Sequence, residues 1–160
     1  IHLPDSSKRF DFEAELGVVM GRQARSVSAS EAFDYVKGFT CVNDLSNRDD
    51  QEREQNWVRG KGFDSAAPIG PVVASPEHVP GDASVQTRVN GELRQDGSRD
   101  DLIFSVEEII EEITEYVTLE PGDVIATGTP RGIASLEEGD EVEIEVEGVG
   151  TLRNTITFLS

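Results

Sequence analysis

The chain has 160 residues, of which 32 are acidic and 14 are basic, and its formal net charge is −18. This length fits one domain with a real hydrophobic core. The strong negative charge repels polyanions, so we expect neither nucleic acid nor an anionic membrane surface among its partners. No apolar stretch approaches the roughly 20 residues that span a bilayer, and no signal peptide is visible, so we expect a cytoplasmic protein.

The first half of the chain mixes extended and helical patterns. Residues 10–20 alternate in hydrophobicity and predict a strand with one apolar face packed on the core. Ser28-Ala29-Ser30-Glu31 has the pattern of a capping box and predicts a short helix that stops before Gly38. Residues 38–45 predict a second strand, and residues 46–57 a helical turn or short helix. Several prolines and glycines predict a middle segment that is rich in loops.

The second half is dominated by strand patterns. Asn90-Gly91 predicts a type I′ hairpin turn after a strand at residues 85–89. Ser105-Val106-Glu107-Glu108 is a second capping box and predicts a helix through Val117. Further strands are predicted at residues 124–127, 141–147 and 151–158. Many strands with two or three short helices, and no βαβ rhythm, predict a β-rich α+β fold.

Cys41 is the only cysteine, so no disulfide can form within the chain. It lies in an apolar run, and neither histidine is near it in the sequence. We therefore interpret Cys41 as a small buried thiol and not as a nucleophile.

Glu13 and Glu15 are candidate metal ligands. They lie two positions apart on a predicted strand, so their side chains leave the same face. Two adjacent carboxylates repel one another unless a cation or a proton lies between them. Asp44, just after the next predicted strand, would complete an all-oxygen site suited to Mg²⁺, Mn²⁺ or Ca²⁺. On spacing alone, however, a solvated polar face is the commoner explanation, and Glu141, Glu143, Glu145 and Glu147 have the same spacing.

Four segments in a fixed order carry more specific information. They are D-F-E-A-E-L-G-V-V-M-G (residues 11–21), N-D-L-S-N-R-D-D-Q (43–51), R-G-K-G-F-D-S-A-A-P-I-G-P (59–71) and G-D-V-I-A-T-G-T-P-R-G (122–132). Together they closely resemble the fumarylacetoacetate hydrolase family. The resemblance covers nearly the whole chain from Asp11 onward. It implies a β-rich α+β fold, a mixed β-sheet roll with a few short helices.

The resemblance also implies roles for individual residues. Glu13, Glu15 and Asp44 match the family's three metal ligands. Lys61 matches the lysine whose ammonium faces the substrate's oxo-carboxylate or enolate, so it is our candidate catalytic residue. The residues matching substrate-binding positions are Arg48, Gln51, Lys61 and Thr129.

Each of these polar residues also has an ordinary structural explanation. Arg48 could form a surface ion pair with Asp49 or Asp50, and Gln51 could be an exposed helix residue. Lys61 lies between two glycines and could belong to a flexible loop. Thr129-Pro130 could be only a turn.

The resemblance implies a divalent-metal-dependent hydrolase that cleaves a C–C bond in acylpyruvate-like or fumarylpyruvate-like dioxo acids through a stabilised enolate. One alternative is an isomerase or decarboxylase of 2-oxo or 2-hydroxy-dienoic diacids, as in aromatic compound catabolism. Another is a catalytically silent metal-binding module. Hydrolytic members use a His–Glu pair partly carried on an N-terminal lid, and neither His2 nor His78 falls in a matching motif. We therefore expect residues 1–160 to be a single catalytic domain that lacks this lid.

The expected cofactor is Mg²⁺ or Mn²⁺, and Ca²⁺ could take its place in crystals. The expected partner is a small oxo-acid substrate. The resemblance further implies a homodimer.

Overall fold

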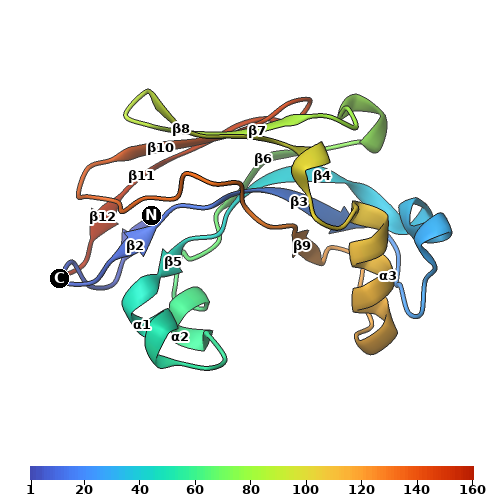
Figure 1. Ribbon diagram of the computed structural model, residues 1–160, viewed down its shortest axis with the longest axis horizontal. Coiled ribbons are helices and arrows are strands. Elements are labelled where there is room, and N and C mark those ends of the chain that lie inside the picture. The colour runs from blue at the N-terminus through green and yellow to red at the C-terminus, as the bar shows by residue number, and fades with distance from the viewer.

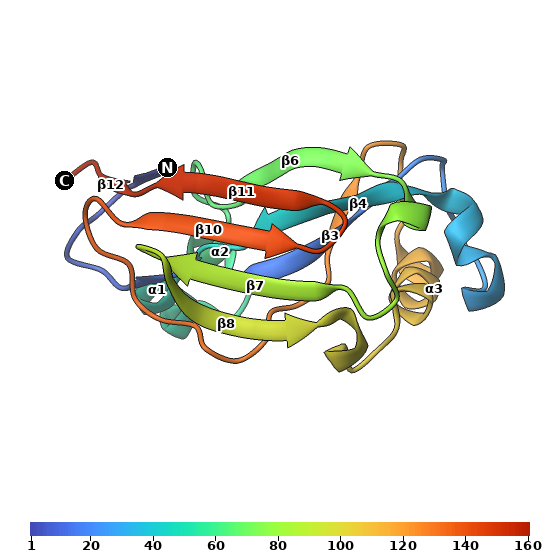
Figure 2. The same ribbon diagram turned by 90° about the horizontal axis from the view of Figure 1, so that it is seen from above.

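Two four-stranded antiparallel sheets lie face to face in the computed structural model, which describes all of residues 1–160 (Figure 1). The outer sheet has the order β11-β10-β7-β8 and covers the second sheet when the molecule is viewed from above (Figure 2). Its strands are β7 Ser84–Val89, β8 Glu92–Ser98, β10 Glu141–Val146 and β11 Gly150–Thr155.

The second, inner sheet has the order β6-β4-β3-β9. Its strands are β3 Ala14–Met20, β4 Val36–Asn43, β6 Ile69–Ala74 and β9 Val124–Ala126. Apolar residues from both sheets, such as Leu16, Val85 and Ile144, belong to one cluster of 27 buried residues. The core therefore lies between the sheets, and the other face of the inner sheet is left to carry the site.

Short elements complete the fold. Strand β2 (Phe10–Asp11) pairs with β5 (Ser46–Asn47), and β1 (His2–Leu3) runs parallel to β12 (Thr157–Phe158). The α-helices are α1 Arg48–Arg53, α2 Val58–Lys61 and α3 Val106–Tyr116, and the 3-10 helices are η1 Ala29–Tyr35, η2 Pro76–His78 and η3 Arg99–Asp101. Helices α1 and α2 extend from one end of the sheets and α3 from the other, so the molecule has the outline of an arch (Figure 1). No helix combines the length and the apolar character needed to cross a membrane.

The β-rich α+β fold is confirmed, and so are two local predictions. Asn90 and Gly91 both have positive φ, as a type I′ turn requires, and they join β7 to β8. Ser105 and Glu108 form the predicted reciprocal capping box at the start of α3. Parallel pairing, which a mixed sheet implies, is confined to β1 and β12.

Three predictions were wrong in detail. The strand expected at residues 10–20 is broken between β2 and β3, which belong to different sheets, and every residue in this range is buried, on both alternating faces. The Ser28 capping box does not form: the Ser28 hydroxyl donates to the Glu31 carboxylate, and a 3-10 helix follows. The expected middle loop contains β6, which tolerates Pro71 because β6 is an edge strand.

Candidate metal centre and active site

The backbone ladder brings three carboxylates together. The Asp44 N–H donates to the Glu13 carbonyl at 2.9 Å, and Ala14 pairs with Asn43. Glu13 and Asp44 are therefore cross-strand neighbours, and Glu15 leaves the same face two residues later. Ligand oxygens of Glu13, Glu15 and Asp44 all lie within 4.8 Å of one another. We call these three residues the acidic cluster.

Lys61 lies against this cluster. Its Nζ donates to Glu13 Oε2 at 2.7 Å and to Asp44 Oδ2 at 2.6 Å. The ammonium thus occupies a position between two of the three carboxylates, where positive charge relieves their repulsion. Sequence reasoning allowed a flexible loop at Lys61, but the residue ends helix α2 and is anchored by both ion pairs.

Gly60 explains why α2 holds this position. A Cβ at residue 60 would lie 3.0–3.2 Å from the backbone and Cβ of Gln51, so only glycine lets α2 pack this closely against α1. The glycine therefore serves the contact between two helices, and Lys61 lies in a helix and not in the loop considered from the sequence.

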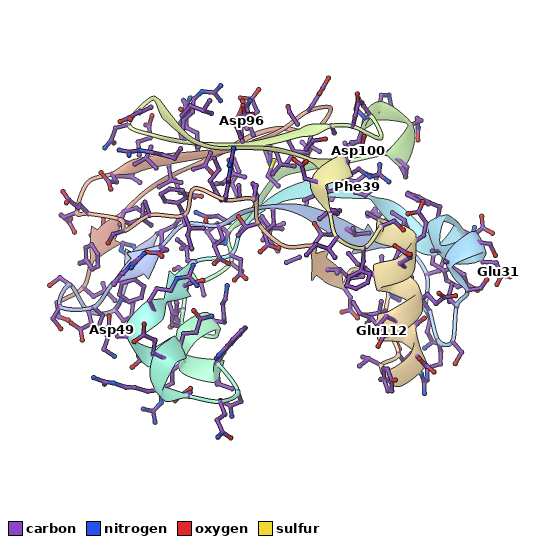
Figure 3. The ribbon with its side chains drawn as sticks, in the orientation of Figure 1. Glu31, Phe39, Asp49, Asp96, Asp100 and Glu112 are labelled. Carbon is purple, nitrogen blue, oxygen red and sulfur yellow. The ribbon has the colours of Figure 1, made fainter.

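Arg48 connects the cluster to a buried acid that sequence reasoning missed. Its guanidinium donates to Asp11 Oδ2 at 2.9 Å, to Gln51 Oε1 at 2.7 Å and to Glu13 Oε1. Asp11 is fully buried. The surface pairing of Arg48 with Asp49 or Asp50 is wrong, and Asp49 lies on the outer side of α1 (Figure 3). Arg48 and Gln51 therefore line the same region as the cluster.

Burial makes the charged forms of these acids costly. Burial, together with the neighbouring Asp44 and Glu13 charges, raises the pKa of Glu15 to about 7, although a hydrogen bond from the Gly128 N–H opposes this. Burial also raises the pKa of Asp44, although its hydrogen bond from Lys61 opposes this. Burial alone would lower the pKa of Lys61, but its hydrogen bonds to Asp44 and Glu13 outweigh that effect and raise it. The cluster therefore favours a bound cation.

Thr129 lies in the segment after β9, beside the cluster. The Gly128 N–H donates to Glu15 Oε2 at 2.6 Å, so this segment contacts a cluster residue directly. The Thr129 hydroxyl accepts a hydrogen bond from Gln95 Nε2 at 2.9 Å. The structure thus places all the residues singled out from the sequence in one region, joined by direct contacts or through one intermediate residue.

Gln95 is a second residue that sequence reasoning missed. Its side chain is fully buried and makes four hydrogen bonds. Oε1 accepts from the Ala14 N–H at 3.0 Å and from the Thr87 hydroxyl at 2.8 Å, while Nε2 donates to Thr129 and to the Pro130 carbonyl. Gln95 therefore ties the strand that carries Glu13 and Glu15 to the segment that carries Thr129. The strand pattern of residues 92–98 contained no signal for this role, because only the distant partners define it.

The donor set fits a hard divalent cation. All three ligands are carboxylates, which Mg²⁺ and Mn²⁺ prefer to nitrogen or sulfur donors. Oxygens bound to one Mg²⁺ at about 2.1 Å lie roughly 3 to 4 Å apart, so small side-chain rotations would bring the cluster into coordination distance.

Neither histidine belongs to this region. His78 is exposed on η2, with Glu77 3.9 Å away, and His2 is exposed on β1. Cys41 is fully buried, as predicted, and burial raises the pKa of its thiol to about 11.

Comparison with known proteins agrees with this geometry. Residues 1–157 match the family described as fumarylacetoacetate (FAA) hydrolase C-terminal. Over 156 residues the chain is 46% identical to the 4-hydroxyphenylacetate degradation bifunctional isomerase/decarboxylase of Salmonella dublin, covering 96% of this chain and 36% of that protein.

Two solved structures are also similar. The 2-hydroxyhepta-2,4-diene-1,7-dioate isomerase of Mycobacterium marinum superposes with a TM-score of 0.96 at 41% identity, covering 100% of this chain and 63% of that one. The fumarylpyruvate hydrolase of Pseudomonas aeruginosa, in complex with Mn²⁺ and pyruvate, superposes with a TM-score of 0.92 at 32% identity, covering 99% and 70%. The chain thus spans only part of the length of each of these proteins.

Proposed function

The chain belongs to the fumarylacetoacetate hydrolase family, and from that premise we propose that it is a divalent-metal-dependent enzyme acting on small 2-oxo acids. The observation that carries this proposal is the convergence of Glu13, Glu15 and Asp44 within 4.8 Å, with Lys61 against two of them. The complex of the Pseudomonas aeruginosa relative with Mn²⁺ and pyruvate supports a divalent metal and an oxo acid as the ligands of this chain.

Glu13, Glu15 and Asp44 would hold Mg²⁺ or Mn²⁺. When bound, this cation supplies Lewis-acid stabilisation of the negative charge that develops on the oxo oxygen. Lys61 adds a second positive charge beside the same atoms, in a partly buried position where electrostatic interactions are strong. Lys61 is also the group that attracts an anionic substrate into a protein of net charge −18.

The other residues bind and orient the substrate. Gln51 is held by Arg48, which fixes the side-chain carbonyl and turns the amide N–H₂ toward other acceptors. The Thr129 hydroxyl accepts from Gln95, so its own proton is free to be donated to a substrate oxygen. Both groups would hold the oxo acid so that its reacting carbon stays beside Lys61.

Two reaction types use this arrangement. Cleavage of a C–C bond in an acylpyruvate by one water molecule yields one carboxylic acid and one 2-oxo acid. Isomerisation or decarboxylation of a 2-oxo or 2-hydroxy-dienoic diacid requires the same stabilised enolate but no attacking water. The names of the Salmonella and Mycobacterium relatives favour the second type, and that of the Pseudomonas relative favours the first.

Assays with added Mg²⁺ or Mn²⁺ on acetylpyruvate, fumarylpyruvate, oxaloacetate and a hydroxydienedioate separate these outcomes. Products identify the reaction: two fragments for hydrolysis, CO₂ for decarboxylation, and an isomer of unchanged mass for isomerisation. Glu13→Gln and Asp44→Asn should abolish turnover, whereas Glu147→Gln, on the exposed surface, should not. Undiminished turnover in both cluster variants would contradict the proposal. Metal binding without turnover of any oxo acid would instead indicate a silent metal-binding module.

We further propose that residues 1–160 act as one catalytic domain and that the chain forms a homodimer, as the family resemblance implies. A scattering mass equal to one chain would contradict the dimer.

A further inference from the structure

Asp11 is a fully buried carboxylate that lies outside the acidic cluster. Its chain neighbours Phe10 and Phe12 are 0% and 1% exposed, so the surroundings are apolar. An ionised carboxylate is costly to bury, and a buried ion pair can often be replaced by apolar residues without loss of stability. Stability alone therefore gives no reason for a charge at this position, whereas the contacts of its two oxygens do.

Two guanidinium groups bind this carboxylate. Arg9 donates from Nε to Oδ1 at 2.8 Å and from Nη2 to Oδ2 at 2.9 Å, and the Arg9 side chain is 56% exposed. Arg48 donates from Nε to Oδ2 at 2.9 Å, and its side chain is only 17% exposed. An exposed guanidinium can exchange its partner for water, so Arg48 is the partner that Asp11 holds in one position.

The backbone brings Asp11 and Arg48 together independently of this ion pair. Asp11 on β2 pairs with Ser46 on β5, and Arg48, which begins α1, donates its N–H to the Arg9 carbonyl at 2.9 Å. Strands β2 and β5 and helix α1 lie together at the end of the sheets opposite α3 (Figure 1). Since both residues are anchored through the backbone, the Asp11 carboxylate gives the long Arg48 side chain one orientation.

From this position Arg48 holds two residues of the site. Its Nη2 donates to Glu13 Oε1, and its Nη1 donates to Gln51 Oε1 at 2.7 Å. The other oxygen of Glu13, Oε2, accepts from Lys61 Nζ, which also donates to Asp44. The bond from Arg48 to Oε1 therefore leaves Oε2 as the oxygen of Glu13 that faces Asp44.

We propose that Asp11 is a positioning residue that acts through Arg48 to orient Glu13 for binding of the divalent cation. This inference rests on the proposed function and adds to it a residue that is not itself a metal ligand. Groups that hydrogen-bond to metal ligands contribute about 10- to 100-fold to metal affinity. Asp11 acts one contact further from the cation than Arg48, so we expect its effect at the lower end of this range.

Calorimetric titration of the chelator-treated protein with Mn²⁺ measures this contribution. Asp11→Asn keeps the size of the side chain but removes its charge and places an amide N–H₂ where a guanidinium donates, so Mn²⁺ affinity should fall by about 10-fold. Arg9→Gln is the matched control. It removes the other, exposed guanidinium from the same carboxylate and should change the affinity by about 2-fold or less.

A double-mutant cycle shows whether Asp11 acts through Arg48. In Arg48→Gln the guanidinium is already gone, so adding Asp11→Asn should lower Mn²⁺ affinity further by about 2-fold or less. A role of Asp11 in general stability would give the same loss with and without Arg48.

Thermal unfolding shows which variants are folded. If Asp11→Asn does not fold, Arg48→Lys tests the same link with Asp11 in place, because an ammonium lacks the planar fork that joins Asp11 to Glu13. Arg48→Lys should then lose Mn²⁺ affinity by about 10-fold, and wild-type affinity in this variant would overturn the inference.

A measurement without metal reports the orientation of Arg48 itself. The Arg48 Nε–H should give a slowly exchanging signal in a ¹H–¹⁵N spectrum, because it is bonded to a buried carboxylate. Its absence from Arg48→Gln assigns the signal. Arg9→Gln should retain this signal, and Asp11→Asn should lose it.

Three results would overturn the inference and leave the metal centre in place. They are equal Mn²⁺ affinity in wild type and Asp11→Asn, an additive loss in the double variant, and an Arg48 signal that is unchanged in Asp11→Asn. Wild-type protein that binds no Mn²⁺ would instead refute the proposed function, and the role of Asp11 with it. The wild-type titration therefore separates the two failures.

Discussion

Glu13 and Glu15 have the same spacing as Glu141, Glu143 and Glu145 on β10, but the surroundings of the two sets differ. Glu13 and Glu15 are 7% and 4% exposed, and Asp44 from another strand joins them. The side chains of Glu141, Glu143 and Glu145 are 51%, 15% and 46% exposed, and each of these three β10 acids pairs with Arg153 or Arg88. The same spacing thus places carboxylates on one face of both strands. Only at β3 do burial and a third acid add enough repulsion between negative charges to favour a bound cation.

The position of each strand explains this difference. Strand β10 lies in the outer sheet, with Val142, Ile144 and Val146 toward the core and the glutamates toward solvent. Strand β3 lies inside the other sheet, and its second face is covered by the segment after β9, where Thr127 and Gly128 bond to Leu16 and Glu15. Solvent screens the charges on β10 but cannot screen those at β3.

The largest effect is expected from removing Lys61, the positive charge beside Glu13 and Asp44. Lys61→Met should lower kcat by roughly 10²- to 10³-fold, because a positive charge beside the developing oxyanion is lost from a water-poor site. Mn²⁺ affinity should be retained, since the three carboxylates remain. Lys8→Met is the control, because Lys8 pairs with Asp50 outside the cluster. Equal kcat values for Lys61→Met and Lys8→Met would show that Lys61 has no part in the chemistry.

The two regions should also differ in their response to pH. Without metal, in the presence of a chelator, Glu15 has a pKa of about 7 in the folded protein, whereas its ordinary pKa, which applies to the unfolded chain, is 4.5. Between pH 4.5 and pH 7 the folded chain therefore retains a proton on Glu15 that the unfolded chain has lost. Raising the pH through this window therefore lowers the free energy of unfolding, by up to about 3 kcal/mol.

Urea unfolding at pH 5 and pH 7.5 measures this difference. Glu15→Gln should lose the destabilisation that wild type shows on raising the pH, and Glu145→Gln should keep it. The same pH dependence in wild type and Glu15→Gln would mean that Glu15 titrates normally in the folded protein.

Removing the support beneath β3 should have a smaller effect. Gln95→Leu leaves the Ala14 N–H and the Thr87 hydroxyl without their buried acceptor, so we expect a loss of about 1–3 kcal/mol in the free energy of unfolding. Gln86→Leu on β7 breaks an exposed bond to Asp96 and a bond from the Arg88 guanidinium, but it leaves no fully buried partner without an acceptor, so it should cost less. If the two variants unfold at the same denaturant concentration, Gln95 does not support the site as described.

The smallest effect is expected from a substitution among the glutamates of β10. Glu145→Gln breaks an ion pair with Arg88 between two partly exposed side chains, so stability should change by about 0.5 kcal/mol or less. Activity and Mn²⁺ affinity should be unchanged. A large loss of either would mean that the two sets of acids are coupled, and the comparison between them would fail.

Local chemistry made several elements predictable from the sequence. The Asn90-Gly91 turn and the Ser105–Glu108 capping box depend on residues a few positions apart, and both are confirmed. The Ser28 box does not form because the Glu31 N–H donates to the Ser28 carbonyl in a 3-10 turn, and the Glu31 carboxylate accepts from the Ser28 hydroxyl. Strand β6 was missed because Pro71 argues against a strand unless its edge position is known.

The residues of the site were harder to predict from sequence patterns than the turns and helix caps. The side-by-side placement of Glu13 and Glu15 follows from strand geometry, but the pairing of Asp44 with Glu13 depends on the register between distant strands. The sequence pattern offered Asp44 as a candidate third ligand, but only the family resemblance indicated Lys61. Asp11 and Gln95 were missed because their roles depend on partners such as Arg48, 37 residues from Asp11, and Ala14, 81 residues from Gln95.

Titration of the chelator-treated protein with Mn²⁺, followed by calorimetry, tests most directly whether the acidic cluster is a metal site. We predict one bound Mn²⁺ per chain for wild type and for Glu145→Gln. For Glu13→Gln, Glu15→Gln and Asp44→Asn we predict affinity lower by at least about 100-fold, since even partners outside the coordination sphere contribute 10- to 100-fold. Wild-type protein that binds no Mn²⁺, or cluster variants that bind it as tightly as wild type, would contradict the metal centre.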